Sequence, residues 1–336
     1  MTRLLALAFA ALIIAAPSGA FAWGNSGHRM IGEAAMMALP GDLPAFLRAP
    51  QAVSDVGEYS REPDRLKGSG KLADSEHSPA HFLDLGDDGH VLGGPLVTEL
   101  TITREDYDTA LRGVGQDSWK AGYLPYAIVD SYQHLARDFA YWRVLKYAET
   151  SPKWKAHRAW FAADRRRREA QILQSIGQLS HFVGDGSQPL HVTIHFNGWG
   201  DYPNPQGFTN AKIHGPFESD LVQAGVKRPM LSAKMTPLRS VSGPIDKHIA
   251  DYLAATGAQV APLYALEKAG GLAIGNPRGV AFAVQQLAIG SSELRDMIAD
   301  AWRASSFQTV GWKPVPVADI LAGKVDPYVP LYSSVD

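Results

Sequence analysis

The sequence of 336 residues contains no cysteine. This absence excludes disulfide bonds, thiolate metal sites and thiol nucleophiles. Any metal ion must therefore be held by histidine, aspartate, glutamate or main-chain atoms. An exported protein without disulfides needs another source of rigidity, such as a large core or bound metal.

The chain also lacks a marked excess of charge of either sign. Its 32 basic and 34 acidic residues give a formal net charge of −2 at pH 7. Proteins that hold nucleic acid over a broad surface are usually strongly basic. Near-neutral charge argues against such a surface, but it is compatible with an enzyme that grips one or two nucleotides.

Long hydrophobic runs are absent after residue 22, so no later segment is expected to cross a membrane. Residues 1–22 combine one charge at Arg3, an apolar run and a small-x-small end, which is the pattern of a secretory signal peptide. The alternative is an uncleaved anchor. We expect cleavage after Ala22, a mature chain over 23–336, and a secreted or periplasmic location.

Alternating β patterns are scarce, whereas apolar residues three and four apart are widespread. These patterns predict helices over residues 27–39, 121–149, 162–183, 216–224, 244–256 and 279–304. Segments rich in Gly, Pro, Asp and Asn predict loops over residues 50–100, 187–215 and 307–336. We therefore predict an all-α fold: a single mainly helical domain over 23–336 with long ordered loops.

The densest group of potential metal ligands lies in SIGQLSHFVGDGSQPLHV, residues 175–192. His181 and Asp185 are four residues apart, which places both on one face of a helix. We expect the two glycines and the proline that follow to end this helix before His191. Three donors within eleven residues could converge on a metal ion.

Further candidates flank this stretch. Downstream, KIHGPFESDLV places His214 and Glu218 four residues apart. Upstream, HFLDL contains His81 and EPDRLK contains Asp64, for which Asp55 is the competing acid. A set of histidines and carboxylates without cysteine suits zinc.

The same spacing occurs at His134 and Asp138, in the middle of a helical pattern with no loop ligand nearby. We interpret this pair as structural. The histidines without a matching partner are interpreted as surface or core residues: His77, His90, His157, His195 and His248.

The ordered set of tryptophan, histidine, aspartate, histidine, His-x3-Asp-x5-His and His-x3-Glu resembles a known family. It is similar to the secreted zinc-dependent phosphodiesterases, which unite fungal single-strand-specific nucleases of the P-one and S-one type with bacterial zinc phospholipase C. The match extends from residue 23 to about residue 220. It implies a mainly helical fold around three zinc ions.

The resemblance implies that Trp23 and His28 hold one zinc ion, with Trp23 acting through its free amino nitrogen and its carbonyl oxygen. Cleavage after Ala22 would create this ligand, because an amide nitrogen is a poor donor and a free α-amine readily loses its proton to metal. Asp185 would bridge this ion to a second through its two carboxylate oxygens.

The other two ions have side-chain ligands in this comparison. The second would be held by Asp64, His81 and His181, with Asp185 shared. The third would be held by His191, His214 and Glu218.

A water held between two zinc ions loses a proton near neutral pH and can attack a phosphodiester. The catalytic residues implied are Asp64, which would also orient this water, and the bridging Asp185. Lys67 is the candidate for binding a phosphate oxygen, with Arg65 as the alternative. For both, a solvated surface charge is the other interpretation.

Phe82 follows the ligand His81. The nucleases have an aromatic residue at this place that stacks on a base, and an acid two residues later that hydrogen-bonds it. Phe82 and Asp84 are therefore the base-site candidates, and a stacked base requires an unpaired strand. The alternative is that Phe82 belongs to the core.

We thus expect an endonuclease-type zinc hydrolase that cleaves single-stranded RNA or DNA to 5′-phosphate products, with no stable protein partner. Glu218 resembles the phospholipase branch, where the nucleases have aspartate, whereas the interval from Trp23 to His28 resembles the nucleases. Phospholipase C is therefore the alternative. A metal-binding helical protein without turnover is a remote third possibility.

Overall fold

The computed structural model describes residues 23–241 and 243–332, so the expected signal peptide over residues 1–22 lies outside the described part. Helices dominate this part of the chain. The two strands in it, β1 (Thr309–Val310) and β2 (Val315–Pro316), form a small antiparallel pair. The prediction of an all-α fold is confirmed.

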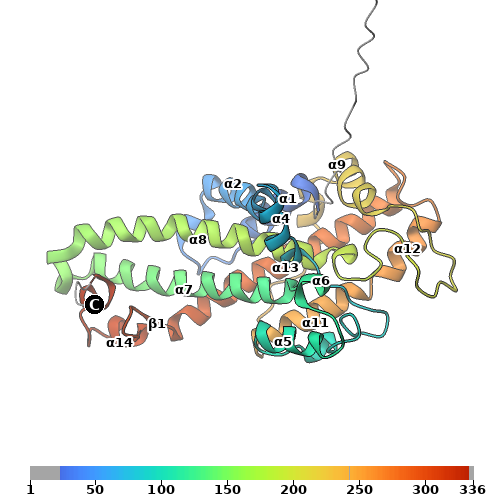
Figure 1. Cartoon of the computed structure of the whole chain (residues 1–336). Helices are drawn as coiled ribbons and strands as arrows, with labels where there is room; N and C mark the ends of the chain where they lie inside the picture. Colours follow the sequence, from blue (N-terminus) through green and yellow to red (C-terminus); the bar gives the residue numbers. More distant parts are fainter. Residues whose placement is uncertain (1–22, 242, 333–336) are drawn as a thin grey trace, which may run out of the picture.

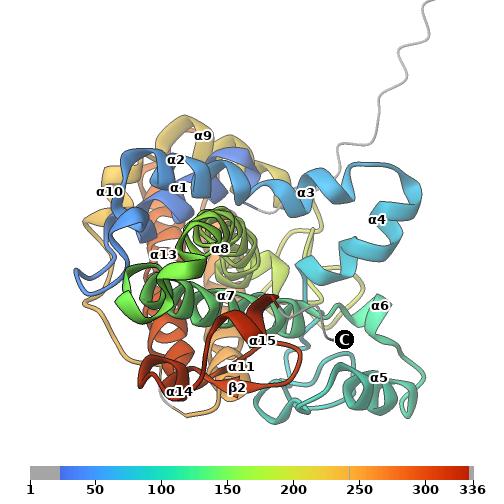
Figure 2. The ribbon, with the colours of Figure 1, turned by 90° about the vertical axis from the view of Figure 1, so that its left-hand side faces the viewer.

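Three long helices form the body of the molecule. Helices α7 (Leu124–Thr150) and α8 (Arg158–Ser187) lie side by side as a long hairpin, joined through η4 (Pro152–His157). Helix α13 (Pro277–Ala304) packs against both, and Figure 2 shows α8 nearly end-on with α13 running across it. α13 begins at a proline, and the side chain of Asn276 caps it by accepting the N–H of Arg278.

The N-terminal helices cover one side of this body. α1 (Gly24–Met37) and α2 (Pro50–Tyr59) pack on α8, and α1 also contacts α13. On the other side α11 (Ile245–Gly257) packs against α7.

Short helices complete the described chain. In order they are η1 (Ala45–Arg48), α3 (Glu62–Lys67), α4 (Lys71–His77), η2 (Ser78–His81), η3 (Val97–Glu99), α5 (Arg104–Arg112), α6 (Ser118–Ala121), η5 (Pro189–His191), η6 (Pro216–Leu221), α9 (Val222–Gly225), α10 (Arg228–Ser232), α12 (Val260–Lys268), η7 (Ser305–Phe307), α14 (Val317–Leu321) and α15 (Tyr328–Tyr332).

A large hydrophobic core joins most of these elements, with buried residues that run from Trp23 to Ala301. Two smaller clusters join the C-terminal β1, α14 and α15 to α7. The six helices expected from periodicity correspond to α1, α7, α8, η6 with α9, α11 and α13. No helix in residues 23–241 and 243–332 is long and apolar enough to cross a membrane.

The expectation of a loop over residues 50–100 was wrong, because α2, α3 and α4 lie there. Pro50 is the first residue of α2 and Pro63 the second of α3. Proline is tolerated in the first helical turn, where no N–H bond is lost, so it marks helix starts here. Packing of the buried Val56 against neighbouring helices stabilises a segment whose composition resembles a loop.

The expectation that glycines end the helix of His181 was also wrong, because α8 continues to Ser187. Both glycines instead allow close packing. A Cβ on Gly184 would lie 3.1 Å from Nδ1 of His28, and a Cβ on Gly186 would lie 2.8 Å from the ring of Tyr252.

Candidate metal centre

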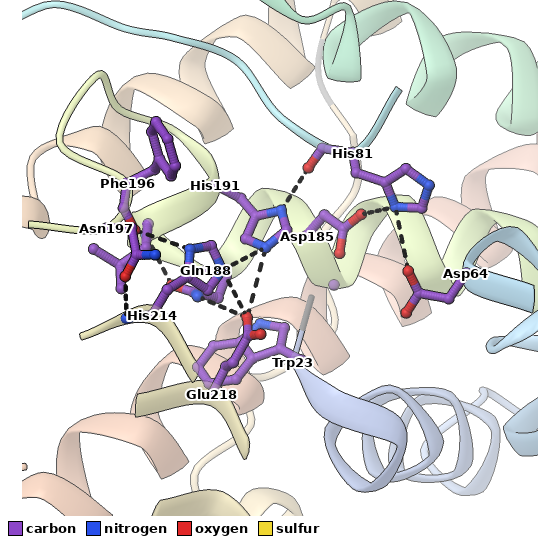
Figure 3. A network of polar contacts seen from close by, with 12 residues as sticks. Trp23, Asp64, His81, Asp185, Gln188, His191, Phe196, Asn197, His214 and Glu218 are labelled. Atoms are coloured by element: carbon purple, nitrogen blue, oxygen red, sulfur yellow. Dashed lines mark hydrogen bonds and ion pairs between the residues drawn. The ribbon is translucent and has the colours of Figure 1, made fainter. Parts of the chain in front are cut away.

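Eight side chains converge on one buried region, carried by α1, α3, η2, α8, η5 and the segment of His214 and Glu218 that includes η6. Figure 3 shows Asp64, His81, Asp185, His191, His214 and Glu218 among them. In each of three groups, the potential ligand atoms lie within 4.8 Å of one another. The groups are His28, His181 and Asp185; Asp64, His81 and His181; and His191, His214 and Glu218. Each of the eight residues was a ligand candidate in the sequence, and all are buried.

Asp185 lies between two of these groups. Its Oδ2 is 3.1 Å from Nδ1 of His81 and 3.4 Å from Nε2 of His181. Its Oδ1 is 3.5 Å from Nε2 of His28. The two oxygens of one carboxylate therefore face different groups, which is the arrangement that a bridging ligand requires.

Backbone carbonyl groups orient three of the histidines. The hydrogen bonds run from His181 Nδ1 to Ser60 O at 2.7 Å, from His191 Nδ1 to His81 O at 2.6 Å, and from His214 Nδ1 to Phe196 O at 2.9 Å. Because a carbonyl oxygen only accepts, each Nδ1 carries the proton. Nε2 is then left to face the other ligands, as in histidines that bind metal.

Burial favours the neutral form of four imidazole rings at the centre. It lowers the pKa of His181 to about 3 and also lowers the pKa values of His28, His81 and His191. Burial raises the pKa of the Asp185 carboxyl well above its usual range, and the charge of Asp64 raises it further. A bound cation would reverse this effect, because it favours the carboxylate and uses the lone pairs of neutral imidazoles.

Unpaired polar atoms are concentrated at this centre. Half of the buried side-chain N and O atoms without a hydrogen-bond partner in the described residues belong to it. They include both ring nitrogens of His28, Oδ1 of Asp185 and Oε1 of Glu218. Buried polar groups are rarely left unpaired, so this donor set fits metal ions. Histidine and carboxylate ligands without cysteine suit zinc.

The third group has the same character. Nε2 of His214 lies 2.8 Å from Oε2 of Glu218 and 3.1 Å from Nε2 of His191. Burial alone would raise the pKa of Glu218, but the adjacent His214 and His191 rings outweigh it when they are protonated and lower that pKa to about 2. Gln188 adds a hydrogen bond to the same carboxylate at 3.3 Å.

The ninth ligand candidate, Trp23, is completely buried beside Glu218 (Figure 3). Its indole N–H donates to Ser187 Oγ at 3.0 Å and its ring packs on Phe217. Its carbonyl oxygen accepts the N–H of Gly27 at 3.0 Å, which leaves one lone pair of that oxygen. The ligand role of its main-chain atoms stays a prediction.

A cavity of about 430 Å³ opens beside the centre and is lined by His81, His191 and His214. All three substrate candidates from the sequence, Lys67, Phe82 and Asp84, also line it. Phe82 is half-buried and lies outside the hydrophobic core.

The charged candidates lie at the centre, whereas the alternatives to them do not. Lys67 Nζ is 3.2 Å from Oδ1 of Asp64, at the edge of the centre. Arg65 instead forms surface ion pairs with Glu58 and Glu62. Asp55 accepts a hydrogen bond from Gln51 and belongs to none of the three groups.

Sequence patterns missed several cavity residues. Trp119, Lys120 and Phe196 line the cavity, but no motif surrounds them. Gly122, two residues after Lys120, has a φ of +76°, which suits glycine. A Cβ there would overlap the carbonyl oxygen of Phe82.

Burial raises the pKa of Asp84 to about 7, although Lys120 opposes the shift.

No family model matches the chain, and no curated protein matches it. The geometry itself consists of three buried groups of potential metal ligands beside a cavity lined by two lysines, aromatic rings and a carboxyl group with a pKa near 7.

Proposed function

We propose that this protein is a zinc-dependent phosphodiester hydrolase that cleaves single-stranded RNA or DNA to 5′-phosphate products. We place it among the phosphodiesterases of the single-strand nuclease and zinc phospholipase C type. The observation that carries the proposal is the position of Asp185, whose two oxygens face two histidine groups with a third group nearby.

We propose three zinc ions. Trp23, His28 and Asp185 would hold the first, and the third would lie with His191, His214 and Glu218. The second ion would be held by Asp64, His81, His181 and Asp185. Zinc supplies Lewis acidity, which lowers the pKa of coordinated water and neutralises the charge of a phosphodiester.

Within the cavity, the chain's own side chains position the substrate. Lys67 is oriented by Asp64 at 3.2 Å and would bind a phosphate oxygen beside the metal centre. Phe82 offers a half-exposed ring on which a base can stack. Asp84, with a pKa near 7, can donate or accept a hydrogen bond at the edge of that base.

This combination supports nucleic acid rather than phospholipid as the substrate. A stacking ring, a hydrogen-bonding acid and a phosphate-binding lysine match the three parts of a nucleotide. A choline headgroup would use the lysine for its phosphate, and the ring and a charged acid for its ammonium group. Asp84, with a pKa near 7, is better suited to a hydrogen bond with the edge of a base.

The test compares zinc content with turnover of single-stranded DNA, single-stranded RNA and phosphatidylcholine. We expect three zinc ions per chain and hydrolysis of both nucleic acids. High activity on phosphatidylcholine with untouched nucleic acid would show the phospholipase instead. One zinc ion and no hydrolysis of any phosphodiester would indicate a metal-binding protein without turnover.

A variant tests the base site directly. Phe82→Ala should weaken binding of single-stranded substrate by about 1–3 kcal/mol, the value of one stacked base, with zinc content unchanged. Phe307→Ala is the matched control, because Phe307 is 89% exposed and does not line the cavity. Loss of metal or of folding in Phe82→Ala would show that Phe82 is a core residue.

A further inference from the structure

Cationic and aromatic side chains extend outward from the cavity beside the candidate metal centre, which we call the metal cavity. Lys120 and Trp119 of α6 line this cavity, Arg104 begins α5, and Tyr123 directly precedes α7. We call these four residues the outer strip. Figure 2 shows α4, α5 and α6 together on one side of the helical body.

Stacking organises the outer strip. The guanidinium carbon of Arg104 lies 3.6 Å from the ring centroid of Tyr123 and 5.3 Å from that of Trp119. Tyr123 is buried, whereas Arg104 and Trp119 are exposed. Tyr123 therefore supports the arginine from beneath by a cation–π contact, and the exposed planes are those of Arg104 and Trp119.

Hydrogen bonds to the end of α4 hold the aromatic rings in place. The indole N–H of Trp119 donates to the carbonyl oxygen of Ser75 at 3.0 Å. The hydroxyl of Tyr123 donates to the carbonyl oxygen of Glu76 at 2.9 Å. Such fixed rings lose little side-chain entropy when a ligand binds.

A second cavity, of about 410 Å³, lies at the far end of the strip and is lined by Arg104 and Tyr123. The short helix η2 separates it from the metal cavity. Ser78 and His81 of this region line the metal cavity, whereas Ala80 lines the outer one. The strip thus connects two cavities on either side of one wall.

We propose that the outer strip and its cavity bind a nucleotide beyond the two that flank the cleaved phosphate, so that the protein acts better on single-stranded polymers than on dinucleotides. Every base has a face that can stack on Trp119 or on the arginine plane, regardless of sequence. Lys120 and Arg104 are exposed cations that can contact successive phosphates. The inference rests on the proposed nuclease function and names its substrate class.

The test measures kcat/KM on a thymidine dinucleotide and on an oligothymidylate of about 12 nucleotides, a length within the range that single-strand sites cover. Arg104→Ala should lower kcat/KM on the oligomer by about fivefold or more, with the dinucleotide value unchanged. Trp119 also lines the metal cavity, so Trp119→Ala should lower the oligomer value by about fivefold more than the dinucleotide value. Arg104→Ala should also reduce the salt dependence of oligomer binding by about one phosphate contact.

Arg112→Ala is the matched control, since Arg112 ends the same helix α5, is exposed and pairs with Asp108. Trp119→Phe loses the hydrogen bond to Ser75 but keeps a ring on which a base can stack. It should therefore retain most oligomer activity. A loss as large as that of Trp119→Ala would overturn the stacking role. Equal losses on both substrates, or no loss on either, would overturn the proposal while the nuclease function stands.

Failure of the nuclease function would appear differently, as a parent protein that cleaves neither substrate. The outer strip is then tested by the binding of the fluorescein-labelled oligomer to the zinc-loaded protein, measured by anisotropy. Weaker binding in Arg104→Ala and Trp119→Ala than in Arg112→Ala would support the strip. Identical binding in all variants would overturn it.

Discussion

Two helices carry the same His-x3-Asp spacing in opposite surroundings. On α7, the side chain of His134 is 47% exposed, and its nearest acid is Asp130 at 3.8 Å, not Asp138. On α8, the side chains of His181 and Asp185 are 0% exposed, with Nε2 and Oδ2 at 3.4 Å. Spacing alone therefore does not distinguish a metal site from a structural pair.

The two aspartates are both buried, but their charges are balanced differently. Asp138 accepts hydrogen bonds from Arg168 at 2.7 Å, from Arg137 at 2.9 Å and from Ser175 at 2.7 Å. Asp185 faces histidine rings and keeps Oδ1 unpaired. The chain provides the cations for Asp138, whereas a charged Asp185 would need a bound cation, because burial of an unpaired carboxylate is unfavourable.

The largest expected effect is that of Asp185→Asn. The amide keeps the shape but loses the charge and one metal-binding oxygen, so turnover should fall more than in any other single ligand variant. We expect a fall of about a hundredfold or more, the typical loss when transition-state charge stabilisation is incomplete. Zinc analysis and single-stranded DNA turnover measure it. Three zinc ions with near-normal turnover would refute the bridging role.

The next effect concerns Trp23. When any residue is retained before Trp23, the main-chain nitrogen of Trp23 belongs to a peptide bond. An amide nitrogen is a poor zinc donor. His28 and one oxygen of Asp185 are too few to hold zinc tightly. We expect about two zinc ions instead of three and a large loss of turnover, both restored when a protease exposes Trp23. Equal zinc and equal rates in the extended and trimmed forms would exclude Trp23 as a ligand.

Acid should destabilise the metal centre. The folded pKa of His181 is about 3, against 6.5 for an ordinary histidine, so between these values the unfolded chain binds a proton that the folded protein does not. Stability is therefore full above pH 6.5 and falls as the pH drops, together with zinc binding. Urea unfolding at pH 7 and pH 5 measures this, and the fall should be smaller in His181→Gln. The same fall in both proteins would contradict it.

Asp138→Asn should act on stability and leave the metal centre unchanged. It removes the acid from a buried ion pair with Arg168 and leaves that guanidinium without its charge partner. Because Arg168 is 17% exposed, we expect a loss of about 2–3 kcal/mol in the free energy of unfolding, below the value for a fully buried pair. Denaturation and zinc analysis together check this, and loss of zinc would show that the two regions are coupled.

The smallest effect should come from His134→Ala. An exposed side chain with only a distant acid contributes little, so the free energy of unfolding should change by about 0.5 kcal/mol or less. Zinc content should also stay unchanged, whereas His181→Ala should lose metal. A loss of zinc in His134→Ala would contradict the interpretation that the His134–Asp138 pair lies outside the metal centre.

Local patterns were sufficient for part of this outcome. Helical periodicity predicted the all-α fold, and residue types and spacing identified His181, Asp185, His191, His214 and Glu218 as candidate ligands. Which side chains would share a group was implied by the family resemblance. The helices within residues 50–100 were missed because their prolines occupy first turns, where composition resembles that of a loop.

By itself, the sequence determined the fold class, the absence of thiol chemistry and the candidate ligands, because these depend on residue types and on spacing along one helix. The sequence favoured Asp64 over Asp55 and a structural role for His134, and in the tertiary structure Asp64 joins the centre whereas Asp55 and His134 do not. Only the tertiary structure decided that Trp119 and Arg104 extend the cavity. These outcomes depend on contacts between distant segments. Whether a buried charge meets an arginine or an unpaired histidine is decided by packing, which no local pattern encodes.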